Sequence, residues 1–133
     1  MKLAYCGDCC NDCPRYIATL SGSKEKLRET ALLMKKVGWT RDIDHPEKSK
    51  CHGCEDVELC EYRVKECCIE QDINNCGECS DYPCVKIQKA FEITQDNSEK
   101  FKMILSEEEY KMFNKAFFLK KKNLDNIRKG LKE

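Results

Sequence analysis

The chain has 133 residues, of which 41% are hydrophobic and 36% are charged, and its 24 basic and 24 acidic side chains balance to zero net charge. This length favours one domain with a modest core, and the composition is too hydrophobic for a disordered chain and too polar for a membrane protein. The N-terminal sequence MKLAYCGDCC lacks the apolar segment of a secretory signal, and no apolar run is long enough to span a membrane. We therefore expect a soluble, cytoplasmic protein that does not bind membranes.

Cysteine is the most unusual component, with twelve residues in two blocks. The first block covers residues 6–13, and the second runs from Cys51 to Cys84. Eight of the twelve form C-x-x-C pairs, at 6/9, 10/13, 51/54 and 76/79. The even number also suits a disulfide scaffold, but a cytoplasmic chain keeps most of its thiols reduced, and metal sites require the C-x-x-C spacing. The pattern therefore predicts metal ligation, with a disulfide scaffold and free thiols as the alternatives.

Between the two blocks, residues 23–37 predict one amphipathic helix. Ser23 can cap its first turn and Gly38 can end it. The apolar residues repeat at helical spacing: Leu27, Ala31, Met34 and Val37. The following polar segment, 40–50, contains a proline and is predicted to be a loop.

After the second block, segments 85–92 and 99–105 are predicted to be helical, and residues 106–131 carry an apolar stripe. This stretch begins with a capping box formed by Ser106 and Glu109. Only Lys120 interrupts the stripe, whose members are Tyr110, Phe113, Phe117, Leu124, Ile127 and Leu131. The pattern fits one long helix or two with a joint near Asn123. Core packing is the ordinary role of such a stripe, and a homodimer through the C-terminal helix is the alternative.

These elements predict a small, mainly α fold in which about four to five helices pack with cysteine-rich, metal-stapled loops of the zinc-knuckle kind. No long alternating strand pattern is present. We expect a single domain over residues 1–133, with a cysteine-rich, metal-binding part at 1–90 and a C-terminal helical part at 91–133.

Charge is unevenly distributed along the chain. Residues 51–84 hold nine acidic side chains against two basic ones, Arg63 and Lys65. This block would repel phosphate, whereas zinc modules that bind nucleic acid present a basic face, so nucleic-acid binding is disfavoured. The lysines at 120–122 are interpreted as the solvated face of a helix. An unidentified protein partner, held by the acidic face or the apolar stripe, is the expected kind of interaction.

Zinc is the metal that the spacing favours, with two or more ions per chain, because zinc usually takes four ligands from two C-x-x-C pairs. The alternative is an iron–sulfur cluster, since the run from Cys6 through Cys9 to Cys13 and Pro14 is similar to ferredoxin runs but differs in spacing. His45 and His52 could each replace a sulfur. The hydrolase motifs H-E-x-x-H and G-x-S-x-G and the P-loop are absent from the sequence, so we predict no catalytic residue and lean against an enzyme.

The motifs together resemble a family of small cysteine-rich prokaryotic proteins catalogued as domain of unknown function 3795. The resemblance covers residues 5 to about 90 and implies metal binding with no established activity. The residues that carry it are Cys6, Gly7, Cys10 and Cys13 in C-G-x-x-C-x-x-C, Cys51, Gly53 and Cys54 in C-x-G-C, and Cys67, Cys76, Cys79, Tyr82, Pro83 and Cys84 in the terminal C-(x)n-C-x-x-C-x-x-Y-P-C pattern. Cys9 and Cys68 are extra thiols that this pattern does not require.

The sequence therefore predicts a structural zinc-binding protein that acts as a protein-interaction module. An iron–sulfur electron carrier is one alternative, and a metal-handling or redox-sensing protein with Cys9 and Cys68 as reactive thiols is another. The predicted ligands are Cys6, Cys10, Cys13, Cys51, Cys54, Cys60, Cys67, Cys76, Cys79 and Cys84. The sequence leaves open which of them share an ion, and whether Cys9, Cys68, His45 or His52 also bind.

Overall fold

A computed structural model describes residues 2–39, 44–54 and 60–132, and these residues form α-helices and short 3₁₀ turns but no β-strand. The mainly helical prediction is confirmed. The six α-helices of the described ranges are α1 (Pro14–Ser21), α2 (Lys24–Lys36), α3 (Val64–Gln71), α4 (Val85–Ile104), α5 (Glu107–Phe117) and α6 (Lys120–Lys132). The 3₁₀ turns are η1 (Cys10–Asp12), η2 (Pro46–Ser49) and η4 (Cys76–Glu78). Within the described part of the chain, no helix is long and apolar enough to cross a membrane.

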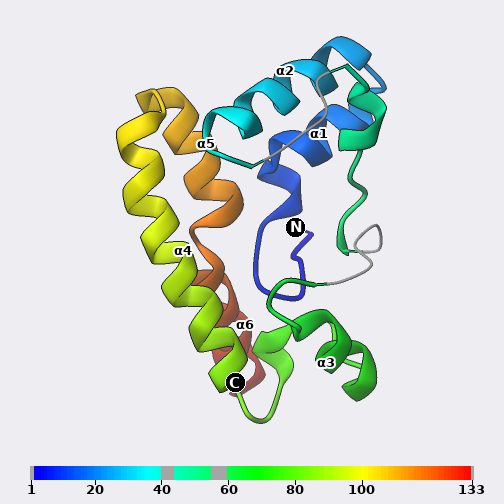
Figure 1. Ribbon diagram of the computed structural model, residues 1–133. Coiled ribbons are helices and arrows are strands. Elements are labelled where there is room, and N and C mark those ends of the chain that lie inside the picture. The colour runs from blue at the N-terminus through cyan, green and yellow to red at the C-terminus, as the bar shows by residue number, and fades with distance from the viewer. Residues whose placement is uncertain (1, 40–43, 55–59, 133) are drawn as a thin grey trace.

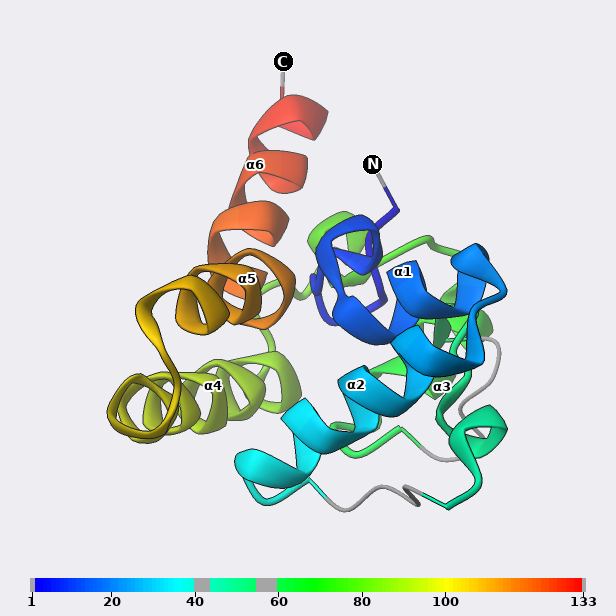
Figure 2. The same cartoon turned by 90° about the horizontal axis from the view of Figure 1, so that it is seen from above.

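The helices surround the N-terminal loop. Helices α4 and α5 lie side by side as a hairpin, and α1 packs against α2 (Figure 1). The loop before α1 lies between α5 and α6 on one side and α3 on the other, as both views show (Figures 1 and 2). The first cysteine block therefore occupies the centre of the molecule.

Helix α2 agrees with its prediction. The Ser23 hydroxyl accepts a hydrogen bond from the Lys26 backbone N–H at 3.2 Å, and Gly38 adopts the left-handed conformation with φ 86° that ends the helix. All four residues of its predicted apolar face are buried: Leu27, Ala31, Met34 and Val37. Of the predicted loop that follows, residues 44–50 are described and contain η2, whereas 40–43 lie outside the described residues.

Two short helices were not predicted, and two predicted helical segments are joined into one. Helix α1 starts at Pro14, directly after the last cysteine of the first block, because proline suits the first turn of a helix. Helix α3 carries Cys67 and Cys68 and is only eight residues long, too short for a clear periodic signal. The segments 85–92 and 99–105 belong to one helix, α4.

The C-terminal stretch forms two helices, but the prediction of a joint near Asn123 is wrong. Helix α5 ends at Phe117 and α6 begins at Lys120. Here Phe118 packs against Phe101 and Tyr110, and the Lys120 ammonium donates to the Phe117 carbonyl at 2.8 Å. The helix is thus interrupted between α5 and α6, where the Phe118 ring and the Lys120 ammonium both point into the protein interior.

Lys120 is also not part of a solvated face, which corrects the interpretation of the lysine run. It is 4% exposed, and its Nζ lies 2.6 Å from Asp8 Oδ1 and over the Tyr62 ring. Lys121, the next residue, is exposed and pairs with Asp125. Lys120 thus interrupts the apolar stripe because it forms a buried ion pair with the first cysteine block.

The first of two cores is aromatic and contains no cysteine. Its buried residues are Met34, Val37, Phe101, Leu105 and Phe113. The Trp39 ring stacks on Phe113 at 5.9 Å between centroids and meets Phe101 and Phe117 edge-on. Within α5 and α6, Phe113 and Leu124 of the predicted stripe are fully buried, which confirms its core-packing role at those positions.

The second core is built around sulfur. It combines buried Cys6, Cys68 and Cys76 with aliphatic side chains of α3, α4 and α6: Val64, Ile87, Ala90 and Leu124. Cys60 and Cys84 are partly buried against it. The cysteine residues are therefore part of the packed interior.

The capping box of α5 is present as predicted. Ser106 Oγ accepts from the Glu109 N–H at 3.1 Å, and Glu109 Oε1 accepts from the Ser106 N–H at 2.9 Å and pairs with Lys36 at 2.9 Å. These bonds lower the pKa of Glu109. The bond from the Ser106 backbone contributes most, and the bond from Lys36 comes next. The stabilisation from Glu109 is therefore present above the ordinary glutamate pKa and is lost as the pH falls through the lowered value.

We expect Ser106→Ala to destabilise the protein by about 1 kcal/mol, because the Glu109 N–H loses its acceptor. Thermal denaturation at neutral pH measures this loss. The matched control is Glu108→Ala, which removes an exposed side chain from the same turn. Equal effects of the two substitutions would contradict the role of the cap.

Candidate metal centres

The first cysteine group consists of Cys10, Cys13, Cys51 and Cys54, which come from two C-x-x-C turns far apart in the sequence. All four line one cavity of about 170 Å³. The second turn is attached to α1 by two hydrogen bonds: the Cys51 N–H donates to Thr19 Oγ1 at 2.8 Å, and Arg15 donates to the Lys50 carbonyl at 3.4 Å. Helix α1, which begins at the first turn, therefore holds the second turn next to it.

The pKa values of this group reflect their proximity. Burial, with smaller contributions from the charges of Cys54, Cys13 and Cys51, raises the pKa of Cys10 to about 12. Burial also raises the pKa of Cys13, and the charge of Cys51 adds to it. For Cys10 and Cys13, burial first and the charges of neighbouring cysteines second therefore favour the protonated thiol when no cation is bound.

Cys9 differs from its neighbour Cys10 although it lines the same cavity. Its backbone N–H donates to the Ala116 carbonyl at 3.0 Å, which attaches the loop to α5. Burial raises the pKa of its thiol, followed by a hydrogen bond with the Asp12 side chain. The pKa of Cys9 is thus affected by Asp12, whereas the pKa of Cys10 is affected by the three other cysteines of the first group.

The second cysteine group gathers on α3, η4 and the start of α4. Its members line one cavity of about 350 Å³: Cys67, Cys68, Cys76, Cys79 and Cys84. The cavity wall also includes the apolar side chains of Val64 in α3, Ile87 in α4 and Ile73 in the segment between α3 and η4. This arrangement brings the terminal C-x-x-C-x-x-Y-P-C motif next to the adjacent cysteines of α3.

The two adjacent cysteines of α3 face different neighbours, because successive helical residues point in different directions. Cys67 accepts a hydrogen bond from the Lys86 ammonium at 3.1 Å near the surface. Cys68 is 1% exposed, and its sulfur lies 3.9 Å from that of Cys76. The shared hydrogen bond of this pair raises the pKa of Cys76 and lowers that of Cys68.

Helix α6 holds the second group in place. The Tyr82 hydroxyl donates to Asp125 at 2.6 Å, and Arg128 donates to the Cys79 carbonyl at 2.9 Å. Gly77 lies so close to the helix that an added Cβ would be 2.9 Å from the Leu124 carbonyl and from Ile127 Cβ. The glycine of this C-x-x-C turn is therefore needed for close approach. In the two other C-x-x-C turns that contain glycine, Gly7 and Gly53 adopt positive φ values of 97° and 110°, which residues with a Cβ rarely adopt.

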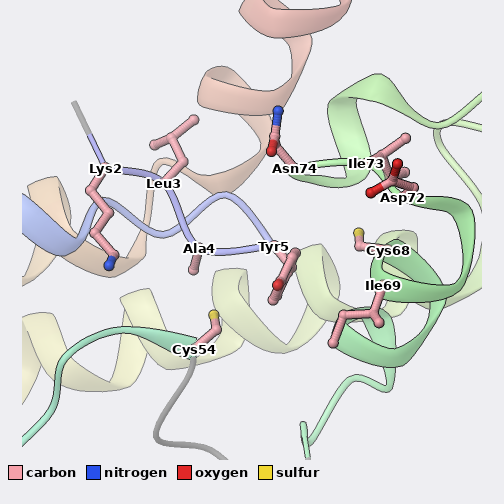
Figure 3. Close-up of a pocket in the computed structure, with 10 residues that line it drawn as sticks. All are labelled: Lys2, Leu3, Ala4, Tyr5, Cys54, Cys68, Ile69, Asp72, Ile73 and Asn74. Atoms are coloured by element: carbon pink, nitrogen blue, oxygen red, sulfur yellow. The ribbon is translucent and has the colours of Figure 1, made fainter.

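Cys6 and Cys60 lie outside both cavities. Cys6 is 8% exposed, and burial, with the charge of Asp8 next, raises its pKa well above the ordinary value. It lies between the groups, since its charge interacts with Cys54 of the first and Cys76 of the second. A cavity of about 390 Å³ also separates them, with Cys54 on one side, Cys68 on the other and Tyr5 between (Figure 3).

The cysteine side chains of the two groups are not arranged as a complete set of metal ligands. In residues 2–39, 44–54 and 60–132, no three cysteine, histidine, aspartate or glutamate side chains are grouped closely enough to hold one ion. His52 is exposed, its carbonyl accepts from Lys2, and the exposed His45 caps η2. The donor set nevertheless fits a thiophilic metal, because each cavity is lined by four or more sulfurs. The sequence reasoning missed two cations near cysteines: Lys86, which donates to Cys67, and Lys120, whose charge acts on Cys6. The only signal for either was the interruption of the apolar stripe at Lys120.

Comparison with known proteins identifies the family. Residues 2–89 match the family described as "Protein of unknown function (DUF3795)". The chain belongs to this family. No curated protein and no solved structure matches it. The DUF3795 match covers both cysteine groups and ends within α4, so α5 and α6 lie beyond it.

Proposed function

We propose that this DUF3795 protein binds two zinc ions through its cysteines and that the ions hold its loops in a fixed shape. The observation that carries the proposal is the first cysteine group, in which two C-x-x-C turns from distant parts of the chain share one cavity. Two such pairs are the usual ligand set of a structural zinc site. For the second ion we propose Cys67, Cys76, Cys79 and Cys84 as the ligands, because all four line the second cavity.

A structural role is supported by what the two groups connect. The segment 44–54 has only η2 as regular structure, and its Cys51 and Cys54 share a cavity with Cys10 and Cys13 at the start of α1. The second group brings together α3, η4 and the start of α4. When zinc is bound, it replaces the thiol protons, and its charge offsets the burial and the neighbouring cysteine charges that raise the pKa of Cys10. Four protein sulfurs per ion leave no open position for a substrate, which favours a scaffold over an enzyme.

The finer proposal is a protein-interaction module. Beside the second group, Val85 is 82% exposed and Ile69 is 57% exposed. A zinc-fixed scaffold would present such side chains to a protein partner in a defined position. Loss of partner capture by Val85→Glu, with unchanged zinc content, is the expected result once a partner is isolated.

Metal analysis of variants tests the zinc proposal. We expect two zinc ions per chain in untagged protein purified without oxygen, and one in Cys51→Ser, because the first group loses a ligand. Cys9→Ala is the matched control: it removes a buried thiol from the same cavity and is expected to keep both ions. Iron with matching sulfide and a broad visible absorption band would overturn the proposal and indicate an iron–sulfur carrier.

A further inference from the structure

Cys68 is the one member of the second cysteine group that a four-ligand site does not need. The other four cysteines of the cavity, Cys67, Cys76, Cys79 and Cys84, already make up the four ligands of one zinc ion. Yet Cys68 is among the most deeply buried side chains of the protein, and its sulfur lies 3.9 Å from that of Cys76. A fifth thiol next to a ligand can react with that ligand.

We propose that Cys68 and Cys76 are an oxidisable dithiol, and that formation of a disulfide between them releases the zinc ion of the second group. This inference rests on the proposed function. Cys76 cannot be a thiolate ligand and part of a disulfide at once, so the disulfide removes one of the four ligands.

Peroxide is the class of oxidant that the site suits, because it is small and both residues line one cavity of about 350 Å³. The Cys76 thiolate attacks hydrogen peroxide, the O–O bond breaks, and a sulfenic acid and hydroxide form. The Cys68 thiol then attacks the sulfenic sulfur, the S–S bond forms, and water leaves. In total, one thiolate, one thiol and one peroxide give one disulfide, one water and one hydroxide.

The geometry selects this pair over its neighbours. The Cys67 sulfur accepts a hydrogen bond from Lys86, and the Cys79 thiol donates to Gln71 Oε1 at 3.5 Å. Neither contact brings a second sulfur close. The carbonyl of Tyr5 accepts from the Cys76 N–H at 2.9 Å, which holds the η4 end of the pair in the core.

The test compares the zinc-loaded wild type with Cys68→Ala and Cys9→Ala, which each remove one buried, non-ligand thiol. Equal zinc contents before oxidation show that the variants fold. On addition of hydrogen peroxide, we expect wild type and Cys9→Ala to release about one zinc per chain, and Cys68→Ala to release it about tenfold more slowly.

Peptide mapping identifies the bond independently of zinc. Cleavage after Glu66, Glu70 and Glu78 separates Cys67 and Cys68 from Cys76, and Cys76 from Cys79. We expect a peroxide-dependent link between the peptides 67–70 and 71–78, placed on Cys68 by fragmentation, and its reversal by a dithiol reductant. A different pairing, or equal zinc release from Cys68→Ala and wild type, would overturn the inference. Protein that forms this disulfide but holds no zinc when isolated would instead overturn the proposed function and the release step.

Discussion

Metal removal is expected to unfold the cysteine-rich part of the protein, residues 1–90. Thiolate binding to zinc is coupled to folding and contributes on the order of 10 kcal/mol per site, more than a core of this size can replace. The sulfur core contains Cys6, Cys68 and Cys76 in place of larger apolar side chains, so little burial compensates for the lost ions. Circular dichroism during anaerobic chelation, followed by zinc addition, measures the loss and recovery of helix.

Tryptophan fluorescence is a second readout of that experiment. Trp39 is the only tryptophan; it packs on Phe113 and also lines the cavity of the first cysteine group. We expect its fluorescence to change together with the helical signal, and protease cleavage to concentrate before residue 90. Unchanged circular dichroism and unchanged thermal stability after complete metal removal would show that the ions have no structural role.

Loss of the Lys120 side chain is expected to destabilise the zinc-loaded protein by about 3 kcal/mol, because it leaves Asp8 without its buried cation. The same substitution removes the bond to the Phe117 carbonyl and the contact with the Tyr62 ring. Since the Asp8 side chain is 25% exposed, we place the cost at the lower end for a buried pair. Urea denaturation of Lys120→Ala measures it.

Lys121→Ala is the matched control for Lys120→Ala. Lys121 precedes Asp125 by four residues on the exposed face of α6, and such a pair contributes about 0.5 kcal/mol or less. A double variant, Asp8→Asn with Lys120→Met, is expected to recover part of the lost stability because no unpaired charge is left. Equal effects of the two single lysine substitutions would contradict the buried ion pair.

Several local features could be read from the sequence because they depend on neighbouring residues. The Ser23 cap, the apolar face of α2 and the capping box at Ser106 each lie within a few helical turns, where spacing alone decides which groups meet. The same holds for the C-x-x-C turns and for the positive φ of Gly7 and Gly53. The family followed from these motifs as well.

The sequence misplaced features that depend on long-range contacts. The break at residues 118–119 depends on Phe118 packing against α4 and on Lys120 reaching Asp8, more than one hundred residues earlier. Helical spacing predicts which residues share a face, but not which partner that face meets. A lysine in an apolar stripe thus looks like an interruption until its carboxylate partner is known.

The sequence by itself determined the helical class, the caps and the presence of C-x-x-C pairs, because these follow from backbone geometry over a few residues. Only the tertiary structure decided that the 10/13 pair meets the 51/54 pair, and that Cys68 turns toward Cys76 while Cys67 turns toward Lys86. The physical reason is that closing a long loop costs chain entropy that many distant contacts must repay together. A pattern of neighbouring residues in the sequence does not predict which of those distant contacts form.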